Sequence, residues 1–131
     1  MNVVVDTSVW SLALRKDAPP DNVRTETLKN LLNQGRVFLV GIVLQEILQG
    51  IHSLERFEDI KTQMDALPLL DLDRDDYLEA ARIWNLCRAE GVQASTTDCQ
   101  ITAACIRHNC ALLTADQDFE HIAQHCALQL A

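Results

Sequence analysis

Four acidic side chains lie far apart in the sequence, each near the expected carboxyl end of a β-strand. They are Asp6, Glu46, Asp98 and Asp116. Asp6 directly follows the apolar run Val3–Val5, and Asp116 follows the run Ala111–Thr114 by one residue. Because ligand sites in open parallel sheets form outside the carboxyl ends of the strands, the four acids point to one edge of such a sheet.

Carboxylates that are packed together repel one another and raise one another's pKa values, so such a cluster needs protons or a cation to persist. Mg²⁺ and Mn²⁺ prefer hard oxygen ligands, typically a few carboxylates with waters and substrate phosphate oxygens. Such ions can activate water and stabilise the leaving oxygen of a phosphoryl displacement. The four acids therefore indicate metal-dependent phosphoryl chemistry.

Each acid also has a simpler structural interpretation. Asp6 and Asp116 are each placed to cap the helix that follows them. Asp98 completes a Ser-x-x-Asp pattern with Ser95, which suits a helix N-terminus. Glu46 lies at the edge of a polar stripe, as an exposed surface residue would. These separate structural roles do not require all four acids to lie at the same edge of the sheet. Their joint placement there therefore favours a shared site.

The elements that must position these acids alternate along the chain. Strands are expected at Val3–Val5, Val37–Val40, Leu69–Leu72, Ala111–Thr114 and Leu128–Leu130. Helices are expected at Thr7–Leu14, Asn22–Asn33, Ile42–Ile51, Leu54–Leu67, Asp75–Ala89, Ser95–His108 and Asp116–His125, with a turn at Asp17–Asp21. Strands separated by helices predict the α/β class, with a parallel sheet that helices cover on both faces.

Length and charge narrow the functional classes. The 131 residues are expected to form one domain spanning 1–131, and the 48% hydrophobic content suffices for an independent core. Eleven Lys and Arg against nineteen Asp and Glu give a net charge of −8. That charge argues against broad binding to phosphate backbones. Any nucleic-acid role would then depend on bound metal ions or a local exception.

Cysteine usage and hydropathy suggest a cytosolic protein. The five cysteines are odd in number, form no C-x-x-C pair and mostly stand among small apolar residues. They are expected to be free thiols in a reducing compartment. No apolar run approaches the roughly 18 residues of a membrane span, and the first residues lack the features of a secretory signal.

The sequence resembles the PIN-domain nucleases, and specifically the VapC-like toxins of type II (VapBC) toxin–antitoxin pairs. The matching segments run in the family's order and cover nearly the whole chain. They are Val3–Ser8, Val43–Ile47, Thr97–Ala104 and Leu112–Phe119. The resemblance implies a three-layer α/β/α fold with a central parallel sheet of about five strands.

The resemblance also assigns roles to individual residues. Asp6, Glu46 and Asp98 match the family's three acids, with Asp6 and Asp98 as the principal metal ligands. Asp116 fits the family's Thr-x-Asp position, which supplies the fourth acid, and Asp118, two residues further on, is the alternative. Two small hydroxyl residues, Ser8 and Thr114, match positions that hydrogen-bond these acids.

The implied activity is that of a Mg²⁺- or Mn²⁺-dependent endoribonuclease that hydrolyses RNA phosphodiester bonds with a metal-activated water held by the four carboxylates. The implied partners are an RNA substrate, a cognate VapB-like antitoxin and a second copy of the chain. The homodimer interface is expected on the segment Ile42–Ile51 or Leu54–Leu67. Candidate RNA contacts are Arg15, Lys16, Arg82 and Arg88. A non-catalytic PIN-like module that binds RNA or protein stays open as an alternative.

Overall fold

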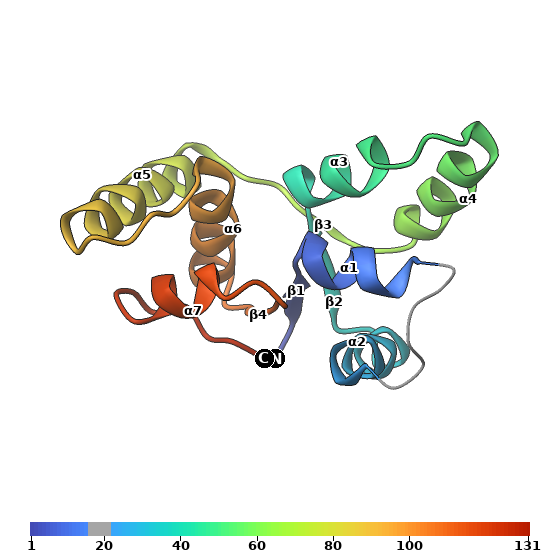
Figure 1. The fold of residues 1–131 in the computed structure, drawn as a ribbon, viewed down its shortest axis with the longest axis horizontal. Helices are drawn as coiled ribbons and strands as arrows, with labels where there is room; N and C mark the ends of the chain where they lie inside the picture. The colour runs from blue at the N-terminus through green and yellow to red at the C-terminus, as the bar shows by residue number, and fades with distance from the viewer. Residues whose placement is uncertain (16–21) are drawn as a thin grey trace.

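A parallel sheet runs through the middle of the molecule (Figure 1). The computed structural model describes residues 1–15 and 22–131, so the predicted turn at Asp17–Asp21 lies outside the described residues. Within them the sheet has four strands in the order β3-β2-β1-β4. They are β1 (Val3–Val5), β2 (Val37–Val40), β3 (Leu69–Leu70) and β4 (Ala111–Leu113). Val3 of the central strand β1 pairs with Val37 on one side and Ala111 on the other.

Seven helices of the described residues cover both faces of this sheet. They are α1 (Thr7–Ala13), α2 (Val23–Asn33), α3 (Gly41–Gln49), α4 (Leu54–Asp65), α5 (Arg74–Ala89), α6 (Thr96–Arg107) and α7 (Asp118–Ala123). Figure 1 shows α1 to α4 on one side of the strands and α5 to α7 on the other. The arrangement is the expected three-layer α/β/α fold.

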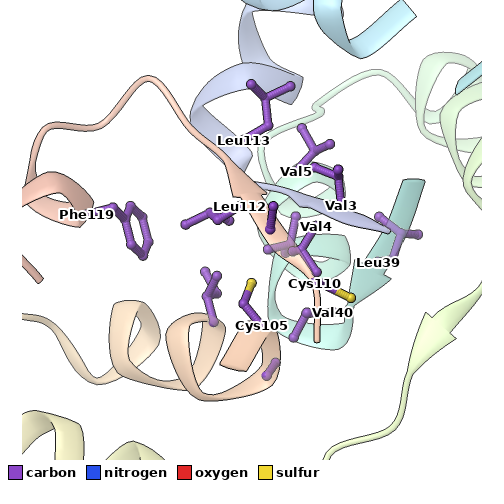
Figure 2. Close-up of a cluster of buried hydrophobic side chains, with 14 of the residues drawn as sticks. Val3, Val4, Val5, Leu39, Val40, Cys105, Cys110, Leu112, Leu113 and Phe119 are labelled. Carbon is purple, nitrogen blue, oxygen red and sulfur yellow. The ribbon is translucent and has the colours of Figure 1, made fainter. Parts of the chain in front are cut away.

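Strands β1 and β4 are uninterrupted apolar runs because helices cover both faces of the sheet there. All three residues of β1 and all three of β4 are buried. Figure 2 shows side chains of β1 and β4 packed with Cys105 of α6 and Phe119 of α7. The five cysteines are free, and burial raises the pKa of the Cys105 thiol far above its usual range. Four of these thiols are small core residues, as the sequence indicated for most of them, and Cys126 is half-buried.

Several predicted elements are shorter in the structure, and three of them lie in the sheet or beside the acids. The expected fifth strand, Leu128–Leu130, contributes only one bridge, between Leu112 and Leu130. The expected strand Leu69–Leu72 is reduced to β3, since the chain turns away into α5. Helix α7 begins at Asp118 instead of Asp116, because the Asp116 carboxylate accepts a hydrogen bond from the Asp118 N–H and holds a turn there.

Helix α6, which carries Asp98, is fastened to α5 by a buried carboxylate. The Asp76 side chain is 2% exposed and lies 2.9 Å from Arg107 Nε and 3.4 Å from His108 Nε2. Asp76 also completes a capping box with Asp73 at the start of α5. Among the described residues, no helix has the length and hydropathy needed to cross a lipid bilayer.

Candidate active site

The carboxyl ends of the adjacent strands β1 and β4 place Asp6 beside Thr114. Val5 of β1 pairs with Leu113 of β4, and the Asp6 N–H donates to the Leu113 carbonyl at 2.9 Å, so the next residues of both strands adjoin. The Asp6 carboxylate accepts hydrogen bonds from the Thr114 hydroxyl at 2.9 Å and the Ser8 hydroxyl at 2.7 Å. Asp6 occupies the N-cap position of α1, but its carboxylate makes no capping bond, so capping does not account for this side chain.

Thr114 connects two of the acids. Its hydroxyl donates to Asp6 Oδ2 and also accepts the Asp116 N–H at 3.0 Å. Ser8 fixes the same loop, since its Oγ accepts the Ala115 N–H at 3.0 Å. The loop that follows β4 is therefore held against the start of α1 by neutral hydroxyl groups, which leaves the carboxylate charges unneutralised.

Three carboxylates converge at this edge. One oxygen from each of Asp98, Asp116 and Asp118 lies within 4.8 Å of the other two. Asp98 stands in the first turn of α6, where its N–H donates to the Ser95 hydroxyl at 3.0 Å. The Asp98 backbone N–H makes the capping contact with Ser95, and the Asp98 carboxylate lies near those of Asp116 and Asp118. Capping by Ser95 and membership of the acidic cluster are therefore compatible. Asp116 and Asp118 come from the turn at the start of α7.

The electrostatics of the cluster are unfavourable without a counter-ion. Burial, together with the negative charges of Asp116 and Asp6, raises the pKa of Asp98 to about 6, although hydrogen bonding from Ser95 opposes the shift. Within residues 1–15 and 22–131, no Lys or Arg forms an ion pair with Asp6, Asp98 or Asp116. A bound cation would neutralise this charge.

Glu46 approaches from the other side of Asp6. It lies on α3 and accepts a hydrogen bond from the Thr7 hydroxyl at 3.0 Å. Glu46 is half-buried, which contradicts the interpretation of an exposed surface residue. It lies outside the group of three converging carboxylates, and its link to the site is Thr7, the neighbour of Asp6 in the chain.

Two residues of this edge were not identified from the sequence. Thr7 was part of the matching segment but received no role, although its hydroxyl orients Glu46. Arg24 lies in the helix expected at Asn22–Asn33 and received no role, yet its Nε donates to the Thr114 carbonyl at 2.9 Å. The contact joins residues 90 positions apart, and no local pattern in the sequence signals it.

The candidate RNA contacts from the sequence are scattered. Arg15 lines a groove with Glu46 on the α1–α3 side. Arg82 pairs with Glu79 at 3.3 Å on α5, and the Arg88 guanidinium lies 5.0 Å from the centre of a Trp84 ring, also on α5. Lys16 lies outside the described residues.

The donor set fits a hard divalent cation. All five candidate ligands are carboxylates, and hard oxygen donors suit Mg²⁺ and Mn²⁺. Three of them already present oxygens to a common point, and Asp98 has a pKa raised by burial and like charge, which a cation would relieve. The described residues therefore fit such an ion.

An α/β/α domain with acids gathered beside the carboxyl ends of adjacent parallel strands, here β1 and β4, has the architecture of a PIN domain. The PIN domain family model matches residues 3–124, and the chain belongs to this family.

Individual relatives and solved structures agree with this assignment. The chain is 29% identical to Ribonuclease VapC11 of Mycobacterium tuberculosis, over 98% of this chain and 97% of that protein. The VapBC2 structure from Rickettsia felis, bound to a promoter DNA fragment, matches with a TM-score of 0.80 and 18% identity, over 100% of this chain and 98% of that one. VapC20 of Mycobacterium tuberculosis, a sarcin-ricin loop cleaving toxin, gives a TM-score of 0.62 and 20% identity over 91% and 93%. The two structural similarities show the fold.

Proposed function

We propose that this protein is a divalent-metal-dependent endoribonuclease and the toxin of a toxin–antitoxin pair. The observation that carries the proposal is the convergence of the Asp98, Asp116 and Asp118 carboxylates at the sheet edge where Asp6 also lies. Membership of the PIN family and similarity to proteins named VapC ribonucleases support the choice of RNA as substrate.

The position of each acid indicates its proposed role in metal binding. Asp6 and Asp98 are the proposed principal ligands of Mg²⁺ or Mn²⁺, and Thr114 and Ser8 hold Asp6 by one oxygen, Oδ2. Asp116 and Asp118 both belong to the proposed ligand set, since the structure brings both to Asp98. Glu46 completes the acidic set from α3, where Thr7 orients it.

Bound divalent ions supply the activation of water and the charge stabilisation that phosphodiester hydrolysis requires. The chain itself contributes oriented carboxylates, and the hydroxyls that bond them are uncharged. The loop after β4 is held by two separate hydroxyl contacts, at Ala115 and at Asp116, so the acids are positioned before an ion arrives.

A protein partner follows from the same similarities. Several similar solved structures are VapBC toxin–antitoxin assemblies, including the one from Haemophilus influenzae. We propose a small VapB-like antitoxin as the partner of this chain, a homodimer as its assembly and the cytosol as its location. The five free cysteines suit a reducing compartment.

The test is a cleavage assay with a matched pair of variants. Purified, partner-free protein is incubated with total tRNA and rRNA in Mg²⁺, in Mn²⁺ and in EDTA. We expect defined fragments only with metal, and a loss of at least about 100-fold in rate for Asp98→Asn, because a metal ligand contributes several kcal/mol to the transition state. Asp59→Asn, an exposed carboxylate on α4, is the control and should cleave normally.

Three results would count against the proposal. If fragments form equally in EDTA, cleavage does not depend on a divalent metal. If Asp98→Asn and Asp59→Asn cleave equally, the acidic cluster that contains Asp98 is not the active site. RNA binding of equal strength by wild type and Asp98→Asn, with no cleavage by either, would favour the non-catalytic binding module.

A further inference from the structure

The side chain of Arg24 reaches from the first turn of α2 to the end of β4. Its Nε donates to the Thr114 carbonyl at 2.9 Å, and Thr114 is the residue whose hydroxyl bonds Asp6 and the Asp116 N–H. The guanidinium is therefore anchored to the loop that holds two of the proposed metal ligands. It reaches that loop without bonding any of their carboxylates.

Anchoring through Nε leaves the outer face of the guanidinium available. Within the described residues, neither Nη atom of Arg24 has a hydrogen-bond partner, and Arg24 forms no ion pair. Arg36 makes a similar Nε contact, to the Met1 carbonyl at 2.7 Å, but its Nη1 is taken by Gln34. The two carbonyl-anchored arginines thus differ in the Nη donors that they leave free.

Arg24 lines a cleft beside the acids. The β4 cleft is a hollow of about 360 Å³ whose lining includes Arg24, Thr27, Thr114, Asp116, Glu120 and Ala131. Its size falls within the range of roughly 300–1,000 Å³ of ligand sites in proteins. Asp116 lines the cleft and also belongs to the acidic cluster, so the cleft opens directly next to the proposed metal site.

The chemistry of this position selects an anion with several oxygens. Two parallel N–H groups of a guanidinium match a phosphate bidentately, and a phosphate contact is stronger than a neutral hydrogen bond. Asp116 and Glu120 would repel that phosphate unless a cation lies beside it, and Arg24 is the arginine in the cleft lining.

We propose that Arg24 binds a phosphate of the RNA backbone next to the one that is cleaved, and so positions the substrate across the acidic edge. This proposal rests on the proposed function, because it names how the same site holds its substrate. Arg24 is a substrate-positioning residue: Thr114 fixes its Nε, and its Nη atoms bind the phosphate.

The test measures RNA affinity in the Asp98→Asn background, which keeps the probe intact. The probe is a fluorescein-labelled single-stranded RNA of mixed sequence, followed by anisotropy in Mg²⁺ as KCl rises. Adding Arg24→Gln should weaken binding about tenfold at low salt, because a charge-assisted contact is lost. It should also make the slope of log affinity against log salt shallower by about 0.7, the value for one phosphate contact on a single strand.

Two further variants separate charge from geometry. Arg24→Lys should keep the salt slope and lose part of the affinity, because lysine keeps the charge but lacks the fork of donors. Arg36→Gln is the matched control, since its arginine has a similar carbonyl anchor at the amino end of β2 and lies away from the acids. It should change neither the affinity nor the slope.

Several outcomes would overturn the proposal. Equal effects of Arg24→Gln and Arg36→Gln would do so, as would an unchanged salt slope or no measurable RNA binding by the parent variant. If the single variant Arg24→Gln weakens Mn²⁺ binding while leaving the salt slope intact, Arg24 only holds the Asp116 loop. The proposed function fails separately, when wild-type protein in Mg²⁺ or Mn²⁺ leaves both RNA pools uncut.

Discussion

At the scale of single residues, Asp98 shows how the chain prepares a site for a cation. Its carboxylate is partly buried in the first turn of α6, and Asp116 and Asp6 add negative charge nearby. The raised pKa, about 6, means that the folded protein holds a proton there more tightly than the unfolded chain does. In the absence of metal, the ionised form of Asp98 is a cost to the fold.

This cost predicts a pH dependence of stability. Because the folded pKa lies above the ordinary value of 3.8, the stability contributed by protonated Asp98 is full below pH about 4 and is lost as pH rises through about 6. In EDTA at pH 7.5, Asp98→Asn should therefore raise the free energy of unfolding by about 1–2 kcal/mol, a value reduced for partial solvent screening.

Urea unfolding of both proteins at pH 4 and pH 7.5 measures this difference. We expect it to be small at pH 4, where wild-type Asp98 is protonated in the folded state. Adding Mg²⁺ at pH 7.5 should then stabilise wild type more than Asp98→Asn, since ligand binding to the folded state adds stability. A difference between the two proteins that is the same at both pH values would contradict the argument.

At the scale of elements, the position of α6 depends on its attachment to α5. Burial opposes the ionisation of Asp76, but hydrogen bonds from the Asp73 backbone, His108 and Arg107 outweigh it and lower its pKa. Asp76 thus stays ionised at neutral pH and joins the start of α5 to the end of α6. The stability that this carboxylate adds is present above pH about 4 and is lost as pH falls through its depressed pKa.

Neighbouring aspartates on α5 give a matched test of this attachment. Asp76→Asn removes a buried charge and should lower the free energy of unfolding by about 2–4 kcal/mol, somewhat less than for a fully buried pair because the Arg107 side chain is 38% exposed. Asp75→Asn removes a carboxylate that is 68% exposed and 4.0 Å from Arg107, and should cost less than about 1 kcal/mol. Denaturant unfolding at pH 7 compares them, and equal losses would show that Asp76 has no special role.

Strong local signals explain which elements were predictable from the sequence. The valine run of β1 and the buried strand β4 have no polar interruption, and Gly91 follows the end of α5 with a φ of 74°, which favours glycine. The start of α7 was misplaced because a side-chain contact, from the Asp118 N–H to Asp116, decides it. Hydrophobic periodicity carries no information about such a contact.

The candidate site was predictable to the extent that strand ends fix it. Asp6 and Asp116 follow strands, so the parallel topology alone brings them to one edge. The hydrogen bond of Arg24 and the attachment of Asp76 join residues 90 and 31 positions apart. Such pairings depend on how helices pack, and a single sequence holds no signal for them.

At the scale of the whole molecule, the net charge of −8 disfavours nonspecific binding to other acidic molecules. Inhibition of RNA cleavage is therefore expected to come from a specific protein partner. If the chain is a toxin, co-expression with the product of an adjacent short reading frame should yield a complex that no longer cleaves RNA. Asp98→Asn should co-purify with that partner as well as wild type does, because an Asn side chain preserves the shape of the site. Co-purification together with undiminished cleavage would contradict control at this site.

The pairing of β1 with β4 also decides when the acidic site comes into existence. Val3 pairs with Ala111, and the Asp6 carboxylate accepts a hydrogen bond from the hydroxyl of Thr114, 108 positions later in the chain. Ribosomes add roughly 5–20 residues per second, so about 5–20 s of synthesis separate the two halves of this contact. During that interval β1 has only β2 beside it, and contacts of such long range are the slow step of folding. The growing chain thus has no assembled site, and the acidic edge is among the last parts of the molecule to form.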